Sequence, residues 1–160
     1  MIGPLKELLA HQAWADAVFF HAWAASGAQG DPELRTRADH QIAVQEAFLQ
    51  VLKGDAVSAP DQPPPEFGVL KARCRSAHEV LRALGRGLDD ASLARTVRVP
   101  WFPDPPCVIT VMEALLQVCL HTQHHRGQNM ARLKALGAAP KNVDFIIWLW
   151  KQKPEGRWPD

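Results

Sequence analysis

The sequence predicts an all-α fold, a four-helix bundle with a short fifth helix near the C-terminal end, in a single domain over residues 1–160. Apolar residues recur at spacings of three and four in four long stretches, as they do on the buried face of a helix. Proline- and glycine-rich segments separate these stretches. With 160 residues, of which 47% are hydrophobic, the chain can bury a core without disulfide bonds.

Start and stop signals set the boundaries of the predicted helices. Asp31 followed by Pro32 is typical of a helix start, because aspartate caps free N–H groups and proline fits the first turn. Glycine after a periodic stretch is typical of a helix end, as at Gly54 and Gly137. Ser58–Pro65 holds four prolines and is expected to be a loop. These signals predict helices over residues 1–26, 32–53, 65–84, 108–136 and 143–152.

The segment between the third and fourth predicted helices lacks the helical pattern. Gly85 and Gly87 are expected to end the third helix. Thr96–Val99 alternates as a short strand does, and the prolines of Trp101–Pro106 exclude regular structure there. Asn142 is expected to cap the last helix.

Composition excludes several function classes. The 18 Lys and Arg residues nearly balance the 17 Asp and Glu, and a net charge of +1 argues against a nucleic-acid or polybasic membrane surface. No apolar stretch is long enough to span a bilayer. Three cysteines without a paired motif, together with the lack of a secretory signal, indicate a cytoplasmic protein with reduced thiols. We therefore expect a small-molecule substrate, and no nucleic-acid or membrane partner.

His121 and His125 give the strongest sign of a metal site. They are four residues apart on the fourth predicted helix, so their rings lie one turn apart and roughly 40° apart around its axis. His124 projects to the other side and is a weaker candidate. A metal site needs a third ligand from another element, and we expect it to be His40. His40 heads a core-facing stripe on the second predicted helix, formed with Val44, Ala47 and Val51.

Spacing alone also fits histidines that only form hydrogen bonds at the edge of the core, and both interpretations stay open at this point. We expect His11, His21 and His78 to belong to this second class. His78 lies close to Glu79 and Arg82, so it is expected on a charged, exposed helix face.

The segment His121–Gln128, HTQHHRGQ, resembles the H-x-x-x-H-R-G-Q signature of the DinB/YfiT-like family of damage-inducible four-helix proteins. Trp14–Asp16 is similar to that family's W-A-N element, and His40 stands where the family has its first ligand. Gly137–Asp144 is similar to the family's G-x-x-P-x-x-x-D ending. The resemblance covers residues 5–150, although Trp101–Pro106 has no counterpart in it.

The resemblance implies an up-down-down-up bundle that forms a homodimer and holds one divalent ion at His40, His121 and His125. An all-imidazole set suits several metals, of which Zn and Ni are our first expectation. Three neutral imidazoles leave coordination positions open, where a bound water or thiol loses its proton more readily.

Relatives in this family suggest two activities. Some transfer a low-molecular-weight thiol, such as bacillithiol or mycothiol, and many others are described as metal-dependent hydrolases. The resemblance therefore implies a thiol S-transferase or a hydrolase that acts on a small electrophile. The alternative is a non-catalytic, metal-binding stress-response protein.

Asp16 and Gln128 are our candidate catalytic residues. Asp16 stands where the family usually has asparagine, and its carboxylate would accept a proton from a ligand imidazole or bind the water on the ion. The alternative for Asp16 is a core-edge carboxylate paired with an arginine. Gln128 lies within roughly 20° of His121 around the helix and is expected to line the site. Arg126 points toward the apolar side, where it would tie helices together or reach a buried carboxylate.

Overall fold

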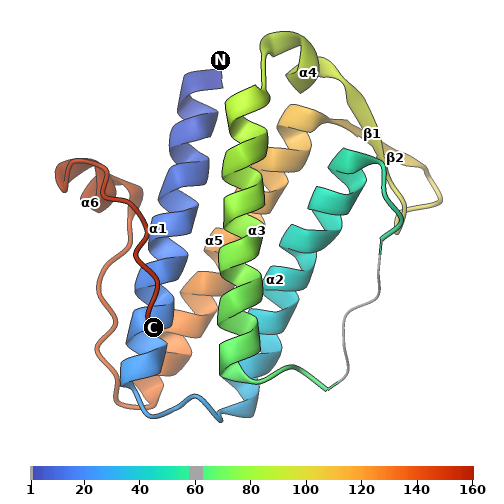
Figure 1. Ribbon diagram of the computed structural model, residues 1–160. Coiled ribbons are helices and arrows are strands. Elements are labelled where there is room, and N and C mark those ends of the chain that lie inside the picture. Colours follow the sequence, from blue (N-terminus) through green and yellow to red (C-terminus); the bar gives the residue numbers. More distant parts are fainter. Residues whose placement is uncertain (1, 58–62) are drawn as a thin grey trace.

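The computed structural model describes residues 2–57 and 63–160, which form a bundle of four long helices with a hairpin and two short helices (Figure 1). The long helices are α1 (Ile2–Ala25), α2 (Pro32–Lys53), α3 (Phe67–Gly87) and α5 (Val111–Ala135). The shorter elements are α4 (Asp90–Ala94), the strands β1 (Thr96–Val99) and β2 (Cys107–Thr110), and α6 (Phe145–Trp150). The prediction of an all-α bundle is confirmed. Within the described ranges no helix is long and apolar enough to cross a membrane.

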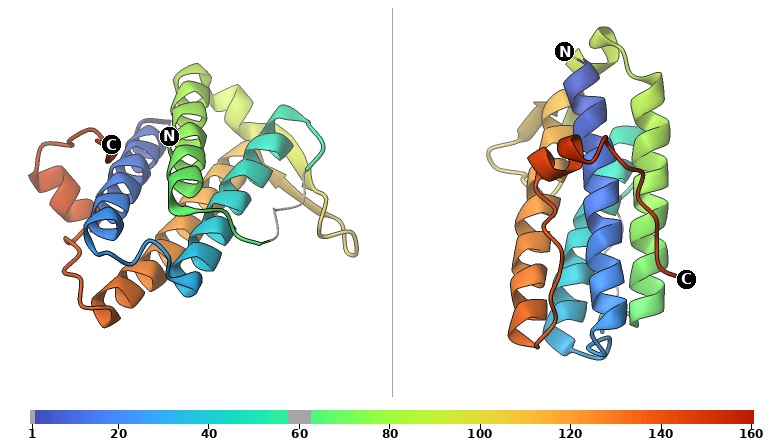
Figure 2. Two further views of the ribbon diagram at one scale, coloured as in Figure 1. Left: turned by 60° about the horizontal axis from the view of Figure 1, so that its bottom comes forward. Right: turned by 90° about the vertical axis from the view of Figure 1, so that its left-hand side faces the viewer.

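The four long helices follow the expected up-down-down-up order (Figures 1 and 2). Helix α1 packs against α3 and α5, and α2 packs against the same two helices. The order around the bundle is therefore α1, α3, α2, α5. Because α2 and α5 are antiparallel neighbours, residues in the first half of α2 lie level with residues in the second half of α5.

The boundaries of α2 are those that the sequence predicts. The Asp31 side chain accepts a hydrogen bond from the Leu34 N–H at 2.9 Å, which satisfies one of the free donors of the first turn. Gly54 ends the helix in the left-handed region with a φ of 82°, a conformation that is cheap for glycine and strained for other residues.

The predicted start of the fourth long helix is wrong. Residues 108–110 belong to β2, which pairs with β1 in an antiparallel hairpin whose turn contains Trp101–Pro106. Helix α5 begins only at Val111, after a capping box in which the Thr110 and Glu113 side chains each bond the other's backbone N–H. The T-x-x-E pattern was the available signal for this start.

Other boundaries also differ from the prediction. Helix α3 continues through Gly85 to Gly87, and Gly85 is buried against Leu9 of α1. Helix α6 begins at Phe145 with Asp144 as its N-cap, although Asn142 does accept a hydrogen bond from the Asp144 N–H. Helix α4 was not predicted. The expected loop at residues 58–65 falls mostly outside the described residues.

The core consists of two apolar clusters with a belt of polar side chains where they meet. One cluster surrounds Leu9 and Leu115, and the other surrounds Phe19 and Leu133. The buried polar residues at this level come from all four long helices: Gln12, Asp16, Gln41, Gln45, His78, Thr122, Arg126 and Asn129. Hydrogen bonds of Asp16 to residues of the other three long helices cross this belt, so it restricts how the helices can slide past one another.

The chain beyond α6 returns across the surface between α1 and α3 (Figure 2). The Arg157 carbonyl is 2.9 Å from Nε2 of His21, and the Pro159 carbonyl accepts from Nζ of Lys71 at 2.9 Å. Gly156 lies so close to α1 that an added Cβ would be 2.8 Å from the Ala13 carbonyl oxygen. This segment lies on the opposite side of α1 and α3 from the groove between α2 and α5.

Candidate metal centre

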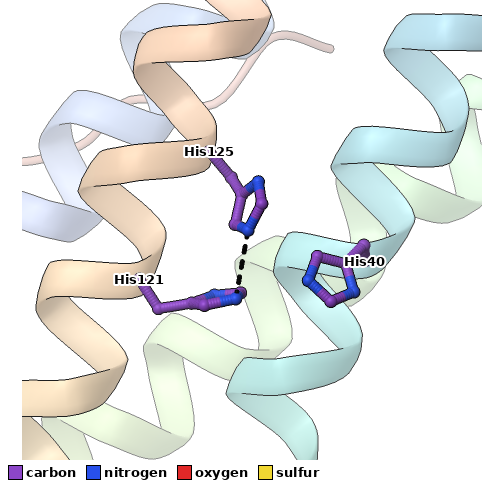
Figure 3. A group of neighbouring side chains, drawn as sticks. All are labelled: His40, His121 and His125. Atoms are coloured by element: carbon purple, nitrogen blue, oxygen red, sulfur yellow. Dashed lines mark hydrogen bonds between the residues drawn. The ribbon is translucent and has the colours of Figure 1, made fainter.

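Three histidines converge in the groove between α2 and α5 (Figure 3). His40 comes from α2, and His121 and His125 come from successive turns of α5. Their ring centroids are 4.3 Å apart for His121 and His125, 4.7 Å for His40 and His125, and 5.1 Å for His40 and His121. Each ring offers one nitrogen, and these three nitrogens lie within 4.8 Å of one another. The group predicted from spacing and from the stripe on α2 is thus brought together.

Two of these rings are held neutral at pH 7. The pKa of His121 is lowered to about 4, mainly by burial and secondly by the charges of the neighbouring histidines. Burial also lowers the pKa of His125, although its hydrogen bond with Gln128 acts in the opposite direction. A neutral imidazole keeps a lone pair on one nitrogen, which is the form that binds a metal ion.

The partners of the histidines separate two classes. His11 Nε2 is 2.8 Å from the Val143 carbonyl, His21 meets a backbone carbonyl near the C-terminus, and His78 meets a carboxylate. These three have the hydrogen bonds expected of structural histidines. His121, by contrast, meets His125 at 3.1 Å through its Nε2, and its buried Nδ1 has no partner among the described residues.

Gln128 orients one of the three rings. Its Oε1 accepts a hydrogen bond from Nδ1 of His125 at 2.8 Å, and its Nε2 donates to Nε2 of His124 at 3.1 Å. A proton on Nδ1 of His125 leaves the lone pair on Nε2, the nitrogen that faces His121. Gln128 therefore contacts the group of three histidines through the ring of His125.

Asp16 lies elsewhere, in the polar belt. Its carboxylate is fully buried and forms a salt bridge with Arg126 at 2.8 Å, while His78 donates to its second oxygen at 2.7 Å. The amides of Gln41 and Gln45 also donate to it, at 3.1 and 3.4 Å. Among the described residues, none of its hydrogen bonds reaches the three converging histidines. The geometry matches the alternative interpretation, a carboxylate paired with an arginine.

The balance of forces on Asp16 keeps it ionised. Burial favours the protonated acid, but the positive charge of Arg126 and the hydrogen bond from His78 outweigh it and hold the pKa well below its usual range. Burial and the nearby carboxylate raise the pKa of Cys74, whose sulfur lies 3.6 Å from Asp16. Asp16, Cys74 and His78 are all metal-ligand types, yet the first is already neutralised by Arg126 and the second holds its proton.

One chain of contacts links this belt to the converging histidines. The amide of Gln45, which donates to Asp16, also lies 3.0 Å from Oγ1 of Thr122. Thr122 is the neighbour of His121 on α5. Through Gln45 and Thr122, the buried carboxylate of Asp16 therefore helps to position the turn of α5 that carries His121.

A cavity of about 820 Å³ opens beside the histidines. Its walls are the second half of α2, the first half of α5, and the β1–β2 hairpin with Trp101 and Phe102. His40 and His121 lie at one end, and its lining is mostly apolar. The turn Trp101–Pro106, which has no counterpart in the family resemblance, thus contributes Trp101 and Phe102 to one wall of the candidate site.

Sequence reasoning missed two parts of this arrangement. His78 is buried and pairs with Asp16, so the expected exposed position is wrong. It follows Cys74 by four residues on the buried stripe of α3, a signal that the neighbouring charges obscured. The role of Trp101 was also missed, because a long turn between two short strands leaves no periodic pattern to read.

Comparison with known proteins identifies one family. The sequence model of the DinB superfamily matches residues 4–129, which include nearly all of α1, all three converging histidines and most of α5. No curated protein and no solved structure matched the chain.

Replacing Asp16 by asparagine should destabilise the fold strongly. The change leaves Arg126 as a buried charge without a counter-ion, a loss on the order of 3–5 kcal/mol in the free energy of unfolding. Urea unfolding at pH 7 measures it, with Arg75→Ala as the control, because Arg75 pairs with Glu79 on the exposed face of α3.

The pH dependence of the same variant checks the cause. The folded pKa of Asp16 lies below the unfolded value of about 3.9, so its stabilising contribution is complete above about pH 5 and is lost as the pH falls toward the folded pKa. The gap between wild type and Asp16→Asn should therefore narrow below about pH 4. A loss no larger than that of Arg75→Ala at pH 7 would contradict this assignment.

Proposed function

This chain belongs to the DinB superfamily, and we propose on that premise that it holds one divalent metal ion at His40, His121 and His125. We further propose that it uses the ion as an enzyme, a thiol S-transferase or a hydrolase acting on a small electrophile. The observation that carries the proposal is the convergence of three imidazole nitrogens beside an open, mostly apolar cavity.

The donor set fits a divalent transition metal. Burial keeps His121 and His125 neutral, so a metal ion would not have to displace protons from them at pH 7. Three imidazoles are the ligands of catalytic zinc sites that keep a further position open, and they suit nickel as well. When bound, such an ion acts as a Lewis acid that lowers the pKa of a water or thiol.

The two reactions differ only in the nucleophile. In S-transfer, the thiol sulfur forms a bond to the electrophilic carbon, the leaving group departs with its bonding electrons, and the thiol proton passes to solvent. In hydrolysis, the oxygen of water takes the place of sulfur and the other steps are the same. The thiol cosubstrate, where one is used, is a low-molecular-weight thiol.

The chain's own residues would prepare the site for either reaction. Gln128 holds the ring of His125 with Nε2 toward the metal position. The apolar walls of the cavity would keep bulk water from an electrophile that hydrolyses easily. Asp16 would act as a positioning residue, through Gln45 and Thr122, on the turn of α5 that carries His121.

Metal analysis tests the site directly. We expect one metal ion per chain in the purified protein without an affinity tag, and none in a His40→Ala/His121→Ala variant. His21→Ala, which removes a histidine that bonds a backbone carbonyl, is the matched control and should keep the ion. Equal metal content in all three proteins, or none in the wild type after addition of zinc or nickel, would contradict the proposal.

Turnover then separates the enzyme from a non-catalytic protein. A metal-loaded protein that transfers thiols to electrophiles, or hydrolyses them, would lose this activity in His121→Ala. Bound metal that raises the melting temperature without any turnover would support the non-catalytic, metal-binding alternative instead.

Replacing Gln128 should weaken metal binding without unfolding the bundle. Gln128→Leu removes the acceptor that fixes the tautomer of His125, and such orienting partners are typically worth about 10–100-fold in metal affinity. Gln128→Glu keeps an acceptor at the same position and should retain most of the affinity. Competition with a chelating dye measures both, and equal affinities for the two variants would exclude this role.

We also propose that the protein forms a homodimer through the outer face of α5. Leu116 and Leu120 lie one turn apart on that face, and Leu120 is 66% exposed. Covering such side chains removes apolar surface from water. Sedimentation velocity should give the mass of two chains for the wild type and of one chain for Leu120→Glu; a single-chain mass for the wild type would contradict the dimer.

A further inference from the structure

The cavity beside the histidines has walls of two kinds. On α2, the side chains that follow His40 along the groove are Val44, Ala47 and Phe48, all apolar. On α5, Glu113 and Gln117 precede His121 at intervals of four residues, so they form one polar edge. The hairpin closes the third side with apolar and aromatic residues.

Aromatic rings lie on the α2 and hairpin walls of the cavity. Trp101 and Phe48 meet edge to face, with centroids 5.3 Å apart and planes at 88°, and Phe102 lies 6.3 Å from Trp101. The side chains of Trp101 and Phe102 are 40% and 54% exposed. Leaving large apolar side chains in contact with water is unfavourable, and such exposed apolar surface often marks a binding site. A flat apolar molecule lying against these rings would cover their exposed faces and gain the contact energy of aromatic pairs.

The charges of the lining residues also limit which ligands fit the cavity. Among the described lining residues there is no lysine and no arginine, and Glu113 is the only residue with a full charge. Glu113 itself is bound through Oε2 to the N–H and hydroxyl of Thr110. Away from His40 and His121, an anionic ligand would leave water without a cationic side chain beside it, and desolvating an unpaired charge is costly.

From these walls we propose that the cavity binds an uncharged, largely apolar molecule with an aromatic ring, held between α2 and the β1–β2 hairpin. This inference rests on the proposed function and specifies the class of electrophile. A cavity of about 820 Å³ suits a ligand of ordinary metabolite or drug size. The side-chain amide of Gln117, on the polar edge, would form a hydrogen bond with one polar group of that ligand. Trp101 is the residue that determines specificity for the ring.

Two fluorescent probes that differ by one charge test the proposal. N-phenylnaphthylamine is uncharged, and anilinonaphthalenesulfonate has a similar ring system with a sulfonate. Both are titrated into the full chain as purified, and again after removal of metal by a chelator, when the protein alone supplies every charge. We expect one uncharged probe per chain, with a dissociation constant at least about tenfold lower than that of the anionic probe, a difference equivalent to about 1.4 kcal/mol.

Variants locate the probe. Trp101→Ala should weaken binding of the uncharged probe about fivefold or more, because it removes an aromatic partner. Trp150→Ala is the matched control, since Trp150 is 74% exposed on α6 and does not line the cavity. Glu113→Gln keeps the capping box of α5 but removes the negative charge of Glu113, so it should strengthen binding of the anionic probe relative to the uncharged probe.

Each contrary result has a definite meaning. Lack of binding, more than one probe per chain, equal binding by Trp101→Ala and wild type, or preference for the sulfonate would overturn the proposal. Absence of probe binding together with dissociation of a dimer by Trp101→Ala would show that a second copy of the chain covers this surface instead. Binding of the probe by a chain that takes up no metal would defeat the proposed function and leave the ligand preference of the cavity intact.

Discussion

The ionised carboxylate of Asp16 is the constraint on which the bundle depends. It is fully buried on α1, and a charge in that position must be compensated by the surrounding helices. Arg126 of α5 and His78 of α3 bond to its two oxygens, and two glutamine amides of α2 complete the shell. Sliding any helix by one turn would break one of these contacts, so the polar belt fixes the relative heights of all four.

That fixed register also aligns the candidate metal centre. Gln41 bonds to Asp16 from α2 next to His40, and Arg126 bonds to it from α5 next to His125. The residues that secure the buried charge are therefore the immediate neighbours of the residues that converge in the groove. The inner contacts determine the register, and the outer imidazoles, which have few partners of their own, follow from it.

Local chemistry made much of this predictable. The two ends of α2 could be predicted from Asp31 and Gly54, because capping depends on residues next to one another in sequence. His121 and His125 could be paired because helical geometry alone brings residues four apart together. His40 could be chosen because it heads a stripe that the sequence predicts to face the core, although His40 itself is exposed and the stripe borders the cavity.

The remainder depends on contacts between distant parts of the chain. Nothing local to Asp16 indicates whether its partner is a metal ligand or an arginine, since Arg126 lies more than a hundred residues away. Only the first strand of the hairpin was predictable, because β1 shows an alternating pattern. Its pairing with β2 joins residues on either side of a long turn, which no local pattern indicates. The cavity wall at Trp101 exists only after that pairing has formed.

The most direct test of the central claim is the position of the metal in crystals of the zinc-loaded protein, located by anomalous scattering. The arrangement described here predicts a single peak bonded to nitrogens of His40, His121 and His125 at about 2.0–2.1 Å and facing the apolar cavity. A peak at Asp16, Cys74 and His78, or no peak between the three converging imidazoles, would contradict it.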